Sequence, residues 1–210
     1  MKYQKYFVIG YNKTATSSFH KLFLLNNIKS FHGLKWDLNN FDSFSDNGEY
    51  QNFKKISKIY PNSIFILNTR PLRNWIISRF EHGEREKHIY YKNGSHWAYP
   101  TSEYLTKDWS FEREKRYYEI LEYFKNQPNR LIIINIESPN WEKFISEKLY
   151  FTNDKIGFNN RHTKSSKNKH IKSIVDNTFK KFKLNPSNLL VNNEEKRNYY
   201  LNIYDNNILN

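Results

Sequence analysis

A predicted strand, a short turn and a predicted helix follow one another near the N-terminus, and this unit constrains the fold more than any other stretch. The apolar run at residues 6–9 predicts a short buried strand, which Gly10 interrupts. Apolar residues return at helical spacing from Phe19 onward. A strand that passes through a tight turn into a helix is the building unit of α/β proteins, in which helices cover a mostly parallel sheet.

The same alternation of strands and helices continues along the chain. Apolar runs bounded by turn residues predict further strands at residues 29–32, 42–44, 63–67 and 131–136. Helical spacing of apolar residues is clearest at residues 16–26, 49–60, 72–80, 111–124 and 141–149. A chain of 210 residues suits one domain. We therefore predict a single α/β domain over residues 1–210, with three α/β/α layers around a central, mostly parallel sheet.

The turn between the first strand and the first helix is rich in hydrogen-bond donors. Lys13 supplies a positive charge, and four small hydroxyl side chains follow it: Thr14, Thr16, Ser17 and Ser18. The amides at a helix N-terminus have no partner inside the helix, and the helix dipole adds positive potential there. This combination predicts a site for a phosphate or a similar anion.

The order of residues in this turn differs from that of the nucleotide-triphosphate loop GxxxxGK[ST], in which the lysine follows a second glycine. Here Lys13 lies three residues after Gly10, and Ala15 stands where a second glycine would be. The order Lys-Thr-Ala-Thr-Ser-Ser resembles the phosphosulfate loop of the sulfotransferases, commonly written K[ST]GT[TS]. The resemblance implies that the turn binds 3′-phosphoadenosine-5′-phosphosulfate (PAPS). Because only a positive φ strongly requires the family glycine, we expect Ala15 to keep a right-handed conformation.

A second segment, IFILNTRPLRNWIISRF at residues 64–80, supports this resemblance. It predicts a strand that ends at Arg70, followed by a helix with Pro71 in its first turn. Sulfotransferases carry a matching element of strand, arginine, seven residues and serine, whose arginine and serine bind the 3′-phosphate of PAPS. Arg70 and Ser78 match these positions, and an arginine fork suits a phosphate dianion. The alternative is that Arg70 caps the helix and Ser78 is a surface residue.

A third segment, at residues 131–149, resembles the family's late strand, acidic residue, proline and helix. We assign its acidic residue, Glu137, a structural role. The resemblance covers roughly the first seven-tenths of the chain, to about Tyr150, and the basic part at residues 159–210 matches weakly. It implies a fold like that of the P-loop nucleotide hydrolases.

The resemblance implies an enzyme that transfers the sulfuryl group of PAPS to a hydroxyl or amine of a small-molecule or glycan acceptor. The reaction is close to phosphoryl transfer, in which positioning and electrostatics dominate. By this analogy Lys13 stabilises the charge that develops on the leaving adenosine 3′,5′-bisphosphate. The 5′-phosphate and the sulfuryl oxygens would be bound by the other residues of the turn, Thr14, Ala15, Thr16, Ser17 and Ser18. The family requires no metal.

In sulfotransferases a His, Glu or Asp between the first helix and the arginine strand acts as general base. His32, Asp37 and Asp46 lie in this region. We prefer Asp46, which follows a predicted strand, over His32, which ends another strand and titrates near neutrality. An aspartate needs a raised pKa to be an effective base. Asp46 before Asn47 is also an ordinary turn residue, and a lone histidine such as His32 is more often structural.

Two less regular stretches carry further predictions. Residues 82–108 show little periodicity and are predicted to be an irregular insertion on the acceptor side. Its aromatic residues are candidates for stacking on the acceptor: Tyr90, Tyr91, Trp97 and Tyr99. Residues 159–172 are strongly basic. They either close over the 3′-phosphate and the adenine, through residues such as Arg161 and Lys164, or form a solvated linker.

The composition of the chain limits the classes of partner that we expect it to bind. The net charge is +13, but the basic residues are dispersed and no familiar nucleic-acid-binding motif appears, so we expect no nucleic-acid partner. No apolar run could span a membrane, and the N-terminus is too short in its apolar part for a signal peptide. We therefore expect a cytoplasmic protein without a membrane partner. The lack of cysteine excludes disulfides and cysteine-based metal sites.

Two alternatives stay open. One is a non-catalytic module that binds an anionic nucleotide or a glycan on a degenerate sulfotransferase fold, because Ala15 departs from the family pattern. The other is a small-molecule kinase of the P-loop class. The position of Lys13 disfavours the kinase, and so does the sequence Asn-Ile-Glu at residues 135–137, where such an enzyme would carry an aspartate after an apolar strand.

Overall fold

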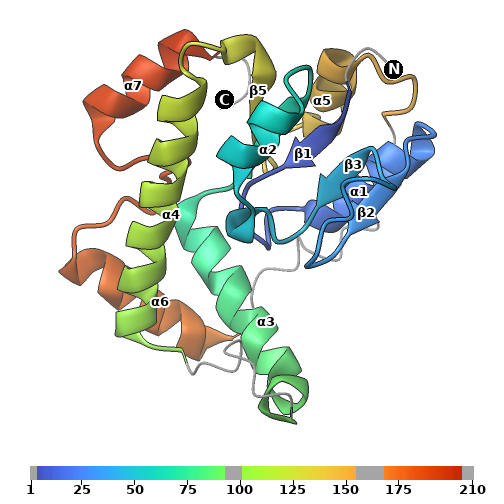
Figure 1. Ribbon diagram of the computed structural model, residues 1–210. Coiled ribbons are helices and arrows are strands. Elements are labelled where there is room, and N and C mark those ends of the chain that lie inside the picture. The colour runs from blue at the N-terminus through green and yellow to red at the C-terminus, as the bar shows by residue number, and fades with distance from the viewer. Residues whose placement is uncertain (1–3, 93–100, 155–167, 205–210) are drawn as a thin grey trace.

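Five parallel strands form the central sheet of the described part of the chain (Figure 1). The computed structural model describes residues 4–92, 101–154 and 168–204. The strand order is β2-β3-β1-β4-β5, and each neighbouring pair is parallel. The strands are β1 (Tyr6–Val8), β2 (Ser30–His32), β3 (Ser43–Ser45), β4 (Ile64–Thr69) and β5 (Leu131–Asn135).

Seven α-helices and two short 3-10 helices accompany these strands within the described residues. The α-helices are α1 (Thr16–Leu25), α2 (Phe53–Ile59), α3 (Leu72–Lys92), α4 (Glu103–Phe124), α5 (Trp141–Leu149), α6 (Lys169–Lys181) and α7 (Glu194–Ile203). The 3-10 helices are η1 (Gly48–Tyr50) and η2 (Pro128–Arg130). The long helices α3 and α4 pack against α6 and extend beyond the sheet in Figure 1.

Helices cover both faces of the sheet because successive residues of a strand point to opposite sides. On one face Tyr6 and Val8 of β1 pack in an apolar cluster with Phe19 of α1 and Ile145 of α5. On the other face Phe7 belongs to a larger cluster with buried residues of α2, α3, α4, α6 and α7. The predicted α/β fold with three layers and a parallel sheet is therefore confirmed.

All five predicted strands are present, with ends that differ from the prediction by at most two residues. The helices predicted at residues 16–26 and 141–149 correspond to α1 and α5, and the one at 49–60 is divided into η1 and α2. Strand boundaries are easy to predict here because each strand is a short apolar run bounded by turn residues.

The prediction that residues 82–108 are irregular is wrong for both described ends of this stretch. Helix α3 continues to Lys92, and α4 begins at Glu103, where the Ser102 side chain accepts a hydrogen bond from the Leu105 amide. In the sequence, residues 81–88 are all polar apart from Gly83, so this part of α3 shows no apolar stripe. Packing of α3 against α4 and α6 supports the long helix. The predicted basic loop also ends early, because α6 begins at Lys169.

The path of the chain reverses across the sheet between β1 and β4. From β1 the chain passes through α1 to β2 and β3 on one side of β1, and then crosses to β4 and β5 on the other side. Buried residues of α1 and α3 belong to the clusters on opposite faces. In open α/β sheets, ligands bind outside the carboxyl ends of the strands at such a switch point. Lys13 follows β1 and Arg70 follows β4, so both lie at this place.

Candidate functional site

The β1–α1 loop (residues 9–15) presents the N-terminus of α1 at the switch point. Helix α1 begins at Thr16, and its N-cap residue, Ala15, gives no side-chain hydrogen bond to the helix. The first turn contains no acidic residue. Because the first amides of a helix lack partners within it, this end of α1 offers hydrogen-bond donors and positive potential to an anion.

Asn68 of β4 fixes the shape of the β1–α1 loop. Its Oδ1 accepts a hydrogen bond from the Gly10 amide at 2.9 Å, and its Nδ2 donates to Thr14 O at 2.7 Å and to Thr14 Oγ1 at 2.6 Å. The Thr14 hydroxyl in turn donates to Tyr11 O. Asn68 and Thr14 are both fully buried. The Thr14 hydroxyl, a predicted contact of the sulfuryl donor, is therefore already bound by Asn68 and Tyr11.

The close approach of Gly10 to Asn68 requires a glycine at this position. A Cβ atom at Gly10 would lie 2.2 Å from Asn68 O, which is far closer than two such atoms can approach. The close packing of β1 against Asn68 therefore demands a residue without a side chain.

The backbone of Ala15 is left-handed, with φ 64° and ψ 30°, so the prediction of a right-handed conformation is wrong. Lys13 is also left-handed, with φ 62°. These two residues flank Thr14, whose side chain and carbonyl are bound by Asn68. The tertiary hydrogen bonds thus impose a conformation that costs a residue with a Cβ about 1–2 kcal/mol.

The two predicted bases converge on the first turn of α1. Asp46 Oδ1 accepts a hydrogen bond from Thr16 Oγ1 at 3.4 Å. His32 Nε2 lies 3.4 Å from Thr16 Oγ1 and 3.3 Å from Ser17 Oγ. Asp46 follows β3 and His32 ends β2, as predicted. Both side chains therefore contact hydroxyls of the predicted anion site. Asp37, the third residue considered as a base, instead binds Asn40 in its own turn.

Arg70 lies directly beside the β1–α1 loop. Its Nη1 donates to Lys13 O at 3.3 Å. Its Nε donates to Glu137 Oε1 at 2.7 Å, and its Nη2 forms an ion pair with the same carboxylate. Asn74 Nδ2 donates to the other oxygen of Glu137 at 2.8 Å. The structural role predicted for Glu137 thus takes the form of a partner for Arg70.

Ser78 and His82 follow Arg70 along α3, and both are half-buried. The pKa of His82 is lowered to about 4, mainly by burial and further by the positive charges of Lys13 and Arg85. His82 is therefore neutral at pH 7, and it lies near enough to Lys13 for the positive charge of the lysine to lower its pKa. Asn74, Ser78 and His82 are four residues apart along α3 and therefore share one face of this helix, the face on which Asn74 binds Glu137 and His82 senses Lys13.

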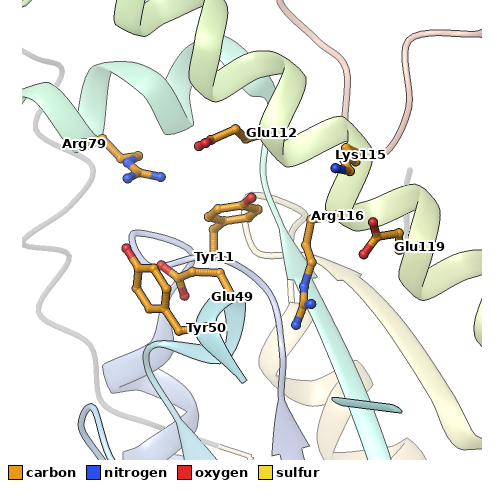
Figure 2. Close-up of a pocket in the computed structure, with 8 residues that line it drawn as sticks. All are labelled: Tyr11, Glu49, Tyr50, Arg79, Glu112, Lys115, Arg116 and Glu119. Atoms are coloured by element: carbon orange, nitrogen blue, oxygen red, sulfur yellow. The ribbon is translucent and has the colours of Figure 1, made fainter. Parts of the chain in front are cut away.

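A pocket of about 350 Å³ opens next to the β1–α1 loop (Figure 2). Its lining residues come from the loop, η1, α3 and α4: Tyr11, Glu49, Tyr50, Arg79, Glu112, Lys115, Arg116 and Glu119. The link to the loop is direct, because Glu49 Oε1 accepts a hydrogen bond from the Asn12 amide at 3.4 Å. Asn12 precedes Lys13, so the pocket begins beside the predicted sulfuryl site.

Burial raises the pKa of Glu49 to about 7, and the nearby charge of Arg79 opposes this shift only in part. Glu49 was not among the residues predicted from the sequence. It nevertheless lies between the first helix and β4, the region from which a base was expected. Its position at the start of the helix predicted at residues 49–60 gave no sign of burial, because the cover comes from α3 and α4, which are distant in the sequence.

Several predicted residues cannot be placed in the site. Arg161 and Lys164 lie outside the described residues, as do Trp97 and Tyr99. Tyr90 and Tyr91 belong to the last turns of α3. The proposals that a late basic loop covers the nucleotide and that these aromatic residues stack on the acceptor therefore stay predictions.

The chain matches no protein-family model, no curated protein and no solved structure. Among the described helices, none is long and apolar enough to cross a membrane. Within the same residues, no three His, Asp or Glu side chains gather into a group that could hold a metal ion. The functional argument therefore rests on the geometry of the switch point and of the pocket beside it.

Proposed function

We propose that the chain is a PAPS-dependent sulfotransferase with a P-loop sulfotransferase fold. The observation that carries the proposal is the hydrogen bond from Arg70 Nη1 to Lys13 O, which joins residues 57 positions apart at the switch point. A nucleotide with phosphate groups at both its 5′ and 3′ positions needs two cationic subsites close together. The β1–α1 loop and Arg70 meet this requirement, because they lie side by side at the ends of neighbouring strands.

The β1–α1 loop is suited to the 5′ end of such a nucleotide. The first amides of α1 would bind the 5′-phosphate, with the hydroxyls of Thr16, Ser17 and Ser18 beside them. When bound, PAPS supplies an activated sulfuryl group on its 5′-phosphate. The Lys13 ammonium would stabilise the charge on the departing phosphate, a contribution that magnesium makes in kinases. The left-handed backbone of Ala15 supports the assignment, because the sulfotransferase motif has glycine at this position.

Arg70 and Ser78 would bind the 3′-phosphate. A guanidinium presents two parallel N–H groups to a phosphate, and a serine hydroxyl adds a donor. In the structure Glu137 accepts a hydrogen bond from this guanidinium, and Asn74 donates to the other oxygen of the same carboxylate. A bound 3′-phosphate would therefore share or displace the Glu137 carboxylate.

A general base would take the proton of the acceptor. Asp46 and His32, which both contact Thr16, stay candidates for this role. Glu49 is a third candidate on the other side of the loop, and its pKa of about 7 suits proton transfer near neutral pH. Asp46→Asn, His32→Asn and Glu49→Gln, each measured for transfer and for nucleotide binding, would assign the base.

The enzyme assay incubates the protein with PAPS and a panel of acceptors and follows the formation of adenosine 3′,5′-bisphosphate. Lys13→Ala should lower the rate by about 10²–10³-fold, as expected for loss of a group that stabilises transition-state charge. Lys21→Ala, at an exposed lysine of α1, is the matched control and should keep the full rate. No turnover with any acceptor, together with no binding of adenosine 3′,5′-bisphosphate, would reject the proposal.

A non-catalytic binding module is the second candidate. The ion pair between Arg70 and Glu137 favours it, because an enzyme that must bind a 3′-phosphate at every turnover would have to open this pair each time. A module of this kind would bind adenosine 3′,5′-bisphosphate and would release no product from PAPS. Binding without turnover would therefore select the module over the enzyme.

A further inference from the structure

The pocket beside the β1–α1 loop has the size and the position of a small-molecule site. Its volume of about 350 Å³ is at the lower end of the range of ~300–1,000 Å³ that is typical of such sites. Figure 2 shows Arg79 and Glu112 above Tyr11, Glu49 and Tyr50, with Lys115, Arg116 and Glu119 on the right. Because Glu49 also binds the amide next to Lys13, a ligand here would lie close to the proposed sulfuryl group.

The pocket is lined by polar and aromatic groups alone, among the residues that the structure describes. Three lining residues are acidic, namely Glu49, Glu112 and Glu119, and three are basic, namely Arg79, Lys115 and Arg116. The two remaining residues are the tyrosines 11 and 50. A steroid, a lipid or a simple phenol needs apolar walls, and a polyanion needs an excess of cations. The balanced charges fit neither class and suit a ligand with many neutral polar groups.

The buried atoms of the lining without a hydrogen-bond partner in the described part of the chain include Glu49 Oε2, an acceptor when the carboxyl is ionised, and Arg116 Nε, a donor. Arg116 is anchored by its Nη2, which donates to Gly48 O at 3.1 Å and to Gln51 O at 2.9 Å. Buried polar groups are rarely left unpaired, because an unpaired group loses its hydrogen bonds to water and gains none in the protein. Hydroxyl groups both donate and accept, so a ligand rich in hydroxyls can satisfy the two atoms.

Tyr50 adds an apolar surface to this polar pocket. Tyr50 lines the pocket and is 59% exposed, so its ring is accessible to a ligand. The C–H face of a pyranose ring packs well on an exposed aromatic ring, while its hydroxyls reach the charged groups around it. A sugar therefore matches both parts of the lining.

We propose that this pocket binds a pyranose unit of a saccharide, and that this sugar is the acceptor of the sulfuryl group. The proposal rests on the proposed sulfotransferase function. A hydroxyl oxygen of the sugar attacks the sulfur atom of PAPS, and the new O–S bond replaces the bond between sulfur and the bridging oxygen. That oxygen leaves with the electron pair on adenosine 3′,5′-bisphosphate. The hydroxyl proton passes to the Glu49 carboxylate, so charge and atoms balance.

The first test compares acceptors with the wild-type protein. N-acetylglucosamine, glucose and lactose represent saccharides, and 4-nitrophenol and decanol represent apolar alcohols, each incubated with PAPS. The expected products are sulfated sugars, detected by mass spectrometry, at rates at least about tenfold above those for the apolar alcohols. A comparison of the transfer rate with lactose and the rates with the two monosaccharides shows whether the pocket binds a terminal unit of a longer glycan. Transfer to 4-nitrophenol or decanol, with none to any sugar, would overturn the proposal.

The second test uses variants of the pocket. Tyr50→Ala should raise the KM for the sugar by about tenfold and leave the binding of adenosine 3′,5′-bisphosphate unchanged. Tyr104→Ala, at a tyrosine that is 73% exposed and does not line the pocket, is the matched control. Glu49→Gln should abolish transfer with normal nucleotide binding. Unchanged KM in Tyr50→Ala and full transfer in Glu49→Gln would each contradict the acceptor site.

A third readout separates this proposal from the sulfotransferase function itself. Saturation-transfer NMR with N-acetylglucosamine, recorded in the presence of adenosine 3′,5′-bisphosphate, reports sugar binding without turnover. A protein that binds the nucleotide and shows no saturation transfer to the sugar keeps the proposed function and loses the saccharide pocket. A protein that binds neither compound loses both.

Discussion

The guanidinium of Arg70 and the carboxylate of Glu137 face each other at the carboxyl ends of β4 and β5, with Arg70 Nε donating to Glu137 Oε1 at 2.7 Å. Asn74 orients the carboxylate from the first turns of α3. Only 15% of the Arg70 side chain and 29% of the Glu137 side chain are exposed, so the pair is partly shielded from solvent. This pair controls the group that we assign to the 3′-phosphate.

Glu137→Gln should strengthen the binding of adenosine 3′,5′-bisphosphate. The substitution keeps the shape of the side chain and removes a negative charge that competes with the phosphate for Arg70. We expect Kd to fall by about three- to tenfold, equivalent to about 0.6–1.4 kcal/mol. Isothermal titration calorimetry measures this change. Glu142→Gln, at the start of α5, provides a carboxylate control. Weaker binding in Glu137→Gln would show instead that the carboxylate positions Arg70 for the phosphate.

Ala15→Gly should stabilise the protein. Glycine removes the cost of a Cβ atom at φ 64°, about 1–2 kcal/mol, and part of this gain is lost because glycine makes the unfolded chain more flexible. The net gain of about 0.5–1 kcal/mol corresponds to a rise in Tm of about 1–3 °C. Asn27→Gly, at φ 58° after α1, is the control and should gain less, since asparagine tolerates this conformation. A lower Tm for Ala15→Gly would contradict the left-handed geometry.

Asn68→Ala should damage both the fold and the nucleotide site. The substitution leaves the Gly10 amide and the Thr14 hydroxyl and carbonyl without their buried partner. We expect a loss of about 2–4 kcal/mol of unfolding free energy, measured by chemical denaturation. Asn135→Ala is the matched control, since this asparagine accepts one hydrogen bond, from the Glu137 amide, and should cost only about 1 kcal/mol. Equal losses of unfolding free energy in both variants would contradict the role of Asn68 in fixing the shape of the β1–α1 loop.

The rate of transfer should rise with pH through about 7 if Glu49 takes the acceptor proton. Burial holds the pKa of Glu49 at about 7, with Arg79 lowering it and Asp46 raising it. Only the ionised carboxylate accepts a proton, so the rate is low below this pH and levels off above it. The measurement is the pH profile of kcat with N-acetylglucosamine. A profile that shows no rise through about pH 7 would exclude Glu49 as the base.

The sequence predicts the sheet and the residues at its edge well, because both depend on local patterns. Short apolar runs define the strands, and Lys13 and Arg70 each follow such a run directly. The parallel pairing of β1 and β4 then brings them together. The role of Thr14 could not be predicted in the same way, because its hydroxyl is bound by Asn68, which is 54 residues away in the chain.

The pocket depends on contacts that a local pattern does not contain. Glu49 lies in the short helix η1, and its carboxyl group is shielded from solvent because α3 and α4 cover it. The length of these two helices was underestimated, since the end of α3 has no apolar stripe. The conformation of Ala15 was also mistaken, because hydrogen bonds to the neighbouring Thr14 impose it and the residue type alone disfavours it.

The most direct measurement is the affinity of the protein for adenosine 3′,5′-bisphosphate relative to adenosine 5′-monophosphate and to ATP with magnesium. Paired subsites at Lys13 and Arg70 predict that the bisphosphate binds at least about tenfold more tightly than the monophosphate. Arg70→Ala should remove this preference, since only the bisphosphate carries a 3′-phosphate. Equal affinity for the two adenosine phosphates, or binding of ATP with magnesium alone, would contradict the assignment of the site to PAPS.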